Sequence, residues 1–514
     1  MSMYTKGIVA SGHKLVSSLA AEVIKAGGNA FDGIVAAGFA AAIAEPALTS
    51  LGGGGFLLGH STKDAQNLFF DFFVDTPGLG VDKDPSELHF YPITVSFSGS
   101  DQEFNVGLGS VAVPGNLKGL LHVHDRLGYM DLGDVLAPAQ ELAKSHILNE
   151  QQAHFLQLLY PIMTMSETGR NLYEPGGQYL KAGSPLQNNT FSEFLGQLAE
   201  DRGESFYYGE IAQKIDRNMR ERGGMLSAED LARYQVHERS PLEIPYRDHL
   251  LLTSPQPSMG GTLIGLSISL LEKLGPFAGE WGESGQLQRT VGLMQEVEKL
   301  RSRGITTPEA LEDFLHNGEL IDTHLQPIRM FSRGTTHISI ADKDGNCASM
   351  TCSNGEGSGY FAPDTGIMLN NMMGEDDLHP DGFHTSPPGM RVGSMMSPSL
   401  LMKGDRVRLV IGSGGSKRIR TAVSQVLSQV VDFSRSLEEA IQAPRMYWDG
   451  EIVQVEPGFT PQATADLKSH VQVNIWPQYD VYFGGVHAVI PGELGVGDPR
   501  RGGAVSIVTK EGME

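Results

Sequence analysis

Apolar residues recur at helical spacing near the start of the chain. From Lys14 to Ala26 they fall at intervals of three and four residues, the pattern of a helix with one buried face. The pair Gly27-Gly28 predicts the end of this helix, because glycine readily adopts the conformation that closes a helix. The next segment, Ala30 to Glu45, is dense in alanine and other apolar residues, so we expect a helix buried on most sides. Pro46 ends it.

A second pattern, with a period of two, runs through residues 336–351. Apolar and polar residues alternate from Thr336 to Ile340, which predicts a half-buried strand. The pair Asp344-Gly345 separates this run from the β-rich run Cys347 to Thr351. An Asp-Gly pair between two such runs indicates a hairpin.

The same two patterns predict further elements along the chain. We expect a strand after the glycine run 52–55, an aromatic strand over 67–74, a helix over 116–127, a strand that ends near Gly415 and a helix that begins near Arg418.

Three segments have no clear pattern. Residues 85–109 are polar and irregular and predict no particular structure. Residues 305–331 are weakly patterned, so we expect them to be exposed or mobile. The run 379–393 is rich in proline and glycine and is expected to form a flexible loop that could act as a lid.

Composition narrows the class of protein. The chain has 514 residues, of which 40% are hydrophobic and 19% charged, as in an ordinary soluble globular protein. Its formal net charge of -22 argues against a partner such as nucleic acid or an anionic membrane, because both require clustered Lys and Arg. No run approaches the ~20 apolar residues of a membrane span. The N-terminus lacks the pattern of a secretory signal, so we expect a cytoplasmic protein.

Two cysteines, Cys347 and Cys352, are too few for a disulfide framework. They could supply a thiol nucleophile or a metal pair. We expect small buried core residues instead, because neither has a His or second Cys at the spacing of a zinc site.

Two glycine-rich stretches could bind a phosphate. Residues 52–55 lack the lysine and Ser/Thr of a P-loop, so close backbone packing is the better interpretation. The second stretch ends in Gly414 and Gly415, between a strand and the start of a helix. There, backbone N–H groups and the positive end of the helix dipole suit an oxyanion, and a phosphate site is the alternative.

The candidate chemistry lies at Thr335, which opens the first strand of the hairpin. If the chain were cut after Gly334, Thr335 would carry both a hydroxyl and a free α-amine. These two groups would serve as a nucleophile and its own general base.

Together these features resemble the gamma-glutamyltranspeptidase family of N-terminal nucleophile hydrolases. The resemblance extends over nearly the whole chain and rests on the shared order of several short motifs: Gly27-Gly28-Asn29-Ala30, Gly52-Gly53-Gly54-Gly55-Phe56, Val113-Pro114-Gly115, Pro257-Ser258-Met259-Gly260-Gly261, Thr335-Thr336-His337, Leu369-Asn370-Asn371, Ser413-Gly414-Gly415 and Asp498-Pro499-Arg500.

The resemblance implies an α+β protein with a four-layer αββα sandwich. It also implies autocleavage at Gly334-Thr335 into a larger N-terminal subunit, residues 1–334, and a smaller C-terminal subunit, residues 335–514. The two subunits would form one fold as a self-associated heterodimer, and the resemblance leaves open a homo-oligomer of that heterodimer. The partner is a small-molecule amide substrate, and neither cofactor nor metal is expected.

The resemblance also implies roles for individual residues. Thr335 would be the nucleophile, and Thr351 and Ser353 align with threonines that the family places across the hairpin. We expect Ser353 to form a hydrogen bond with the Thr335 amine. Gly414 and Gly415 match the glycine pair of the oxyanion hole.

The substrate pocket departs from the family pattern. Phe73 replaces the arginine that holds the glutamyl α-carboxylate, and Ser394-Met395 replaces a Ser-Ser pair. Loss of a bidentate arginine weakens carboxylate binding. Asn354 and one acidic residue are left to hold the α-amino group, the candidates being Glu375, Asp376 and Asp377.

Three functions are therefore compatible with the sequence. The first is an amide hydrolase or acyltransferase that acts on γ-glutamyl or related amides through a Thr335 acyl-enzyme. The second is a related acylase or amidohydrolase with another acyl group, of the glutaryl (cephalosporin) or oxamate type. The third is a non-catalytic binding protein that keeps the fold, because fold alone does not fix function.

Overall fold

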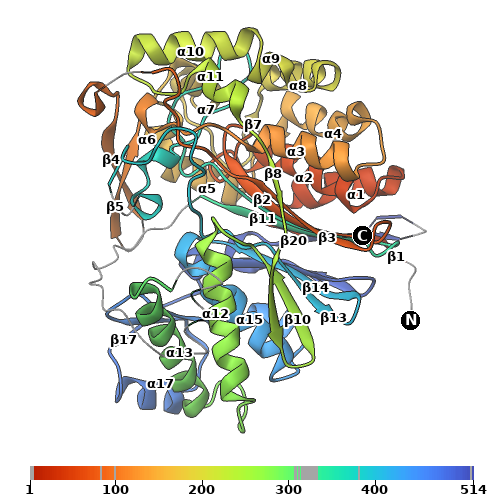
Figure 1. Cartoon of the computed structure of the whole chain (residues 1–514), viewed down its shortest axis with the longest axis vertical. Helices are drawn as coiled ribbons and strands as arrows, with labels where there is room; N and C mark the ends of the chain where they lie inside the picture. The colour runs from red at the N-terminus through yellow and green to blue at the C-terminus, as the bar shows by residue number, and fades with distance from the viewer. Residues whose placement is uncertain are drawn as a thin grey trace.

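Two stacked β-sheets form the centre of the molecule. The computed structural model describes residues 5–81, 84–97, 100–305, 310, 313, 334–379, 382–509 and 512–513. Helices cover the outer face of each sheet, so the layers run helix, sheet, sheet, helix (Figure 1). The αββα arrangement expected from the sequence is confirmed.

The first sheet is antiparallel throughout and has the strand order β20-β1-β11-β12-β2-β3-β8. Its strands are β1 (Thr5–Ser11), β2 (Gly54–Ser61), β3 (Gln66–Phe72), β8 (His237–Arg239), β11 (Thr336–Asp342), β12 (Cys347–Ser353) and β20 (Ala504–Thr509). Strand β1 therefore lies between two strands that come from beyond residue 334.

The second sheet has the order β19-β18-β14-β13-β10-β9, and its neighbours are also antiparallel. Its strands are β9 (Leu242–Tyr246), β10 (His249–Thr253), β13 (Ser399–Lys403), β14 (Arg406–Gly414), β18 (Gly485–Ile490) and β19 (Leu494–Val496). Both sheets thus combine strands from the two sides of the Gly334-Thr335 bond.

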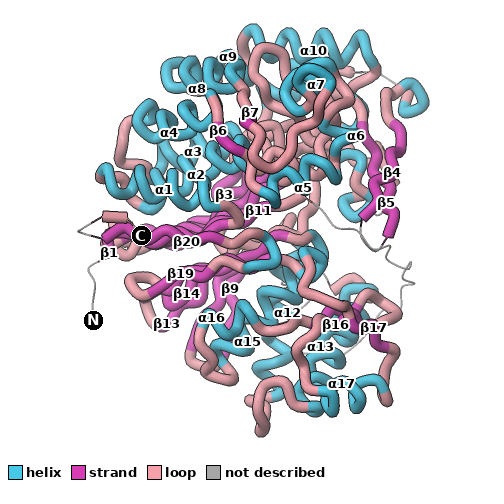
Figure 2. The backbone as a smooth tube through the Cα atoms, turned by 180° about the vertical axis from the view of Figure 1, so that it is seen from behind, coloured by secondary structure: helices cyan, strands magenta, loops and turns pink. Residues whose placement is uncertain are grey.

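Helices complete the two outer layers (Figures 1 and 2). The first sheet is covered by α1 (Lys14–Ala26), α2 (Ala30–Ala44), α3 (Asn116–Leu127) and α4 (Leu132–Lys144). The second is covered by α12 (Met259–Leu274), α15 (Ile419–Val431) and α16 (Leu437–Gln442), with α13 (Ser284–Ser302) packed against α12.

Smaller elements lie at the periphery. The strands are β4 (Tyr91–Phe97) paired with β5 (Ser100–Val106), β6 (His146–Ile147) paired with β7 (Pro185–Leu186), and a sheet of β15 (Met446–Trp448), β16 (Val453–Val455) and β17 (Val473–Ile475). The helices are α5 (Glu150–Leu158), α6 (Tyr160–Met163), α7 (Glu167–Tyr173), α8 (Asn189–Asp201), α9 (Glu204–Tyr207), α10 (Glu210–Arg222), α11 (Ala228–Arg233) and α17 (Pro461–Lys468).

The strand β11 is not half-buried as its alternating pattern predicts. All seven of its residues are buried, because its polar face meets the second sheet instead of water. Side-chain hydroxyls bridge the two layers: Ser339 donates to the carbonyl oxygen of His487 (2.9 Å), and Ser349 donates to that of Ile411 (3.0 Å). Buried polar groups are tolerated here because they are hydrogen-bonded.

The unpatterned segments have different outcomes. Residues 85–109, for which nothing was predicted, contain the β4–β5 hairpin at the edge of the molecule (Figure 2). The segment 305–331 lies outside the described residues except at 305, 310 and 313. The described residues of the run 379–393 form turns without regular helix or strand. None of the helices in the described part of the chain is long and apolar enough to cross a membrane.

Candidate active site

Thr335 lies immediately before β11, and Gly414, the last residue of β14, packs against its backbone. Thr335 is buried, with 4% of its surface exposed. A Cβ placed on Gly414 would lie 2.4 Å from the Thr335 carbonyl oxygen, so only glycine allows β14 to end this close. The Arg501 guanidinium donates to the same oxygen over 3.3 Å. The backbone of Thr335 is therefore held by the end of β14 and by Arg501.

A pocket of about 370 Å³ opens at Thr335. It brings together six residues that the sequence singles out: Phe73, Thr335, Ser353, Glu375, Ser394 and Met395. The other residues that line it are Met372, Leu378, Met396, Ser416 and Ile419. The wall is mostly apolar with a few polar groups, as is usual for a small-molecule site.

Ser353 contacts the bond that precedes Thr335. Its hydroxyl donates to the carbonyl oxygen of Gly334 (2.6 Å) and accepts from the backbone N–H of Gly355 (3.1 Å). The expected partner was the Thr335 amine. In the intact chain that nitrogen is an amide without a free lone pair, so the adjacent carbonyl is the better acceptor.

Thr351 does not line the pocket. It is fully buried, and its hydroxyl bonds Nδ1 of His337 (2.8 Å), whose Nε2 lies 3.0 Å from the Ser339 hydroxyl. Burial holds the pKa of His337 well below its ordinary value, so the imidazole is neutral. The structure thus places Thr351 in the polar layer between the sheets, two residues deeper along β12 than Ser353.

The start of α15 lies at the pocket. Gly415 has a φ of 123°, which favours glycine, and a short 3₁₀ turn (Ser416–Arg418) leads directly into the helix. Ser416 and Ile419 both line the pocket. The positive end of the helix dipole therefore lies at the pocket wall.

The acidic residue on the pocket wall is Glu375. Glu375 is buried and lines the pocket, whereas Asp376 is exposed and does not; the side chain of Asp377 lies outside the described part of the chain. Met372, Glu375 and Leu378 line the wall at intervals of three residues; Met372 and Leu378 lie in two 3₁₀ turns (Met372–Gly374 and Asp376–Leu378), and Glu375 lies between these turns. That spacing is a signal that could have distinguished Glu375 from the two aspartates.

Asn354 is not among the residues that line the pocket. It is 1% exposed, and neither its Oδ1 nor its Nδ2 has a hydrogen-bond partner among the described residues. Of the described side chains expected to hold the α-amino group, only that of Glu375 therefore lies on the pocket wall.

Phe73 presents an aromatic ring where an arginine would hold a carboxylate. The ring packs against Phe56, with centroids 5.6 Å apart. The nearby Arg391 already has partners within the protein. It donates to the Phe73 carbonyl oxygen and to the Tyr234 hydroxyl, and its Nε lies 3.2 Å from Asp75. Among the described residues that line the pocket there is no Lys or Arg.

Sequence reasoning missed Glu45. Thr336, the residue after Thr335, donates its hydroxyl hydrogen to Glu45 Oε2 (2.9 Å). Burial raises the pKa of Glu45 to about 7, although the Thr336 hydrogen bond and the charge of Arg501 oppose this. A lone acidic residue between an apolar helix and Pro46 was the available signal.

The two cysteines and the first glycine run have structural positions in the core. Both cysteines are buried, which raises the pKa of each thiol, and neither lines the pocket, so the core interpretation holds. A Cβ on Gly53 would lie 2.1 Å from the Ser353 carbonyl oxygen, which confirms close packing of the first glycine run. The described residues contain no group of three His, Cys, Asp or Glu side chains suited to a metal ion.

Proteins of known sequence and structure are similar to this chain over most of its length. The sequence pattern of the gamma-glutamyltranspeptidase family matches residues 16–508. A glutathione hydrolase proenzyme of Escherichia coli (strain K12) is 29% identical over 507 residues, covering 91% of this chain and 85% of that protein. The acylase ACY 1 proenzyme of Pseudomonas sp. (strain V22) is 29% identical over 493 residues, covering 90% and 86%. The crystal structure of a cephalosporin acylase from Bacillus halodurans shares the fold, with a TM-score of 0.81 at 23% identity over 98% of this chain and 95% of that one.

Proposed function

The chain belongs to the gamma-glutamyltranspeptidase family, and we propose that it is an amide hydrolase or acyltransferase whose nucleophile is Thr335, released by a cut at Gly334-Thr335. The observation that carries the proposal is the hydrogen bond from Ser353 to the Gly334 carbonyl oxygen at the base of the pocket. The similar proteins described as proenzymes support the cut.

The proposed cut uses groups already in contact. The Thr335 hydroxyl attacks the Gly334 carbonyl carbon, and the Ser353 hydroxyl stabilises the charge that develops on the carbonyl oxygen. The C–N bond then breaks, and the nitrogen takes a proton to become the Thr335 α-amine. Water hydrolyses the resulting ester and leaves a carboxylate on Gly334. Residues 1–334 and 335–514 remain together as a heterodimer.

Amide cleavage then follows the same chemistry. The freed α-amine, with an ordinary pKa of about 8, accepts the proton of the Thr335 hydroxyl as that oxygen attacks the substrate carbonyl. Gly414, Gly415 and the start of α15 supply the positive field for the oxyanion. The protonated amine returns its proton to the leaving nitrogen, and water or an amine releases the acyl group.

The pocket favours an acyl group without a free carboxylate. Among the described residues no cation lines the wall, and Phe73 with three methionines makes it apolar. A carboxylate would lose its hydration there without gaining a charged partner. An acylase-type reaction on an acyl group without a carboxylate, unlike the glutaryl and oxamate types, is therefore our first candidate.

Glu375 supports a second candidate. Its carboxylate on the wall suits an ammonium group, which γ-glutamyl compounds carry next to their carboxylate. Hydrolysis or transfer of γ-glutamyl groups thus remains a candidate in which the amine, more than the carboxylate, is recognised.

Four nitroanilides separate these candidates because they vary amine and carboxylate independently: γ-glutamyl (both), glutaryl (carboxylate), γ-aminobutanoyl (amine) and butanoyl (neither). We expect faster turnover of the two anilides that have no carboxylate.

The processed protein should show two fragments, the smaller beginning at Thr335, and Thr335→Ala should stay uncut and inactive. An uncut wild-type band with no turnover of any anilide would favour the non-catalytic alternative.

A further inference from the structure

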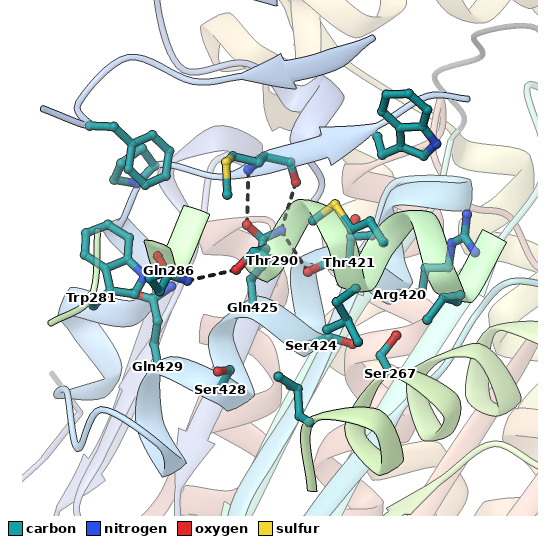
Figure 3. Close-up of a pocket in the computed structure, with 18 residues that line it drawn as sticks. Ser267, Trp281, Gln286, Thr290, Arg420, Thr421, Ser424, Gln425, Ser428 and Gln429 are labelled. Carbon is teal, nitrogen blue, oxygen red and sulfur yellow. Dashed lines mark hydrogen bonds between the residues drawn. The ribbon is translucent and has the colours of Figure 1, made fainter. Parts of the chain in front are cut away.

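A second cavity, of about 720 Å³, lies away from Thr335 between α12, α13, α15 and the small sheet that begins with β15 (Figure 3). None of its lining residues lines the catalytic pocket.

Most polar side chains on its walls are already bonded within the protein. Gln425 donates to the backbone oxygens of Thr421 and Met446 (both 3.0 Å) and accepts from the Met446 N–H. Gln286 donates to the Thr290 hydroxyl (2.8 Å), and Ser428 donates to Asp432 (3.1 Å). These groups shape the cavity but have little hydrogen-bonding capacity left.

Ser424 is the exception. It sits in the middle of α15 with 6% of its surface exposed, and its Oγ has no hydrogen-bond partner among the described residues. A buried serine inside a helix usually donates to the carbonyl four residues earlier. Leaving a buried hydroxyl unpaired costs stability, so its presence in a cavity wall points to a partner that enters from the cavity.

Arg420, one helical turn before Ser424, helps to define the chemistry of that partner. Its Nε also lacks a partner among the described residues, while its Nη2 bonds Glu298 (2.8 Å). Glu298 is shared with Arg301, so one carboxylate faces two guanidinium groups. The two unspent donors, Ser424 Oγ and Arg420 Nε, suit an acceptor such as a carbonyl oxygen.

Aromatic side chains supply the apolar part of the wall. Trp281 and Phe459 lie with ring centroids 5.5 Å apart, and Trp448 lines the same cavity from β15. The Arg435 guanidinium covers the Trp281 ring at 4.1 Å from its centroid and is bonded to Gln429 (2.7 Å). Indole and phenyl surfaces bind flat rings by stacking or edge contacts.

We propose that this cavity is a binding site for an aromatic molecule that carries a carbonyl group, such as an aryl ketone or aryl amide. The ring packs against the aromatic part of the wall, and the carbonyl oxygen accepts a hydrogen bond from Ser424. The site is independent of Thr335 chemistry, so it exists whether or not the chain is cut.

The neutral naphthyl ketone prodan tests this proposal directly. Trp281 and Trp448 are two of the three tryptophans in the chain, so energy transfer from tryptophan to prodan reports binding beside them. The titration is run on wild type and on Thr335→Ala, which keeps failure of processing separate from failure of this site. Saturable transfer in both proteins is the expected result.

Two matched variants identify the hydroxyl. Ser424→Ala removes only an unpaired hydroxyl and should weaken prodan binding by about two- to tenfold, the worth of one neutral hydrogen bond. Ser428→Ala removes a hydroxyl that is spent on Asp432 and should leave prodan affinity unchanged. Phenylnaphthylamine, which has no carbonyl, should bind wild type and Ser424→Ala equally.

A variant that fills the cavity shows whether prodan binds there. Thr290 is half-buried and lines the cavity, so Thr290→Phe should abolish transfer while thermal unfolding shows an intact fold. Absence of saturable prodan binding to wild type would overturn the proposal. Unchanged prodan affinity in a folded Thr290→Phe protein would also overturn it. Unchanged affinity in Ser424→Ala would do the same, and this variant does not require the fold to accept a larger side chain.

Discussion

The hydroxyl of Ser353 donates a 2.6 Å hydrogen bond to the carbonyl oxygen of Gly334, the carbonyl that Thr335 would attack. This contact places a donor where negative charge develops in the proposed cut. It also gives Ser353 a role in processing that precedes any role in turnover.

Ser353→Ala should slow appearance of the two fragments by about 10²–10³-fold, the usual effect of removing one oxyanion donor. A time course on denaturing gels measures the rate. Ser353→Thr keeps the hydroxyl and should process nearly as fast as wild type. Processing of Ser353→Ala at the wild-type rate would show that the contact is only structural.

Gly414→Ala should block processing, because the new Cβ would lie 2.4 Å from the Thr335 carbonyl oxygen and displace it. Fragment formation and anilide turnover are the measurements. Gly393→Ala is a suitable control, since its Cβ would meet nothing nearer than the Pro257 oxygen at 3.7 Å. Normal processing of Gly414→Ala would mean that the close approach is not needed.

Phe73→Arg should raise kcat/KM for γ-glutamyl and glutaryl anilides by about tenfold or more, because it adds a charged partner for the carboxylate. The butanoyl anilide, which has no carboxylate, should not gain, and Phe73→Met serves as a neutral control. If γ-glutamyl turnover did not improve, the carboxylate would lie elsewhere in the pocket.

Glu45 should make the uncut protein less stable as pH rises from about 4.5 to about 7. In this window the folded state keeps the Glu45 proton while the unfolded state has lost it, so raising the pH favours unfolding. The loss is on the order of 3 kcal/mol. Glu45→Gln, which cannot ionise, should lack it.

Thermal unfolding below pH 4.5 and above pH 7 checks this, with Thr335→Ala as the parent of both proteins so that neither is cut. The Tm difference between Glu45→Gln and its parent should grow in favour of Gln at the higher pH. Equal pH dependence in the two proteins would assign the ionisation to another group.

Local patterns predicted the elements that carry the site. Helix α1 and the β11–β12 hairpin follow from periodicity and turn chemistry, and α15 follows from the glycines before it. The degree of burial of β11 could not follow, because its polar residues face a second sheet that is distant in sequence. Such contacts are not contained in a period of two.

The site residues divide in the same way. Thr335, Ser353 and Phe73 were predicted and line the pocket. Thr351 and Asp376 were also predicted but do not line the pocket. Thr351 bonds His337 between the sheets, and Asp376 is exposed on its 3₁₀ turn. Glu45 reaches Thr336 only through tertiary packing across 291 positions of sequence, which no local pattern reports.

The position of β1 between β11 and β20 has a consequence for assembly. A cut before β11 breaks one covalent bond and no strand pairing, yet it turns folding from a single-chain event into an encounter between two chains. The native molecule would keep its shape after the cut, held by an interleaved sheet. Once unfolded, the two chains would have to meet again, so refolding would depend on protein concentration. The intact chain, in contrast, folds without such an encounter.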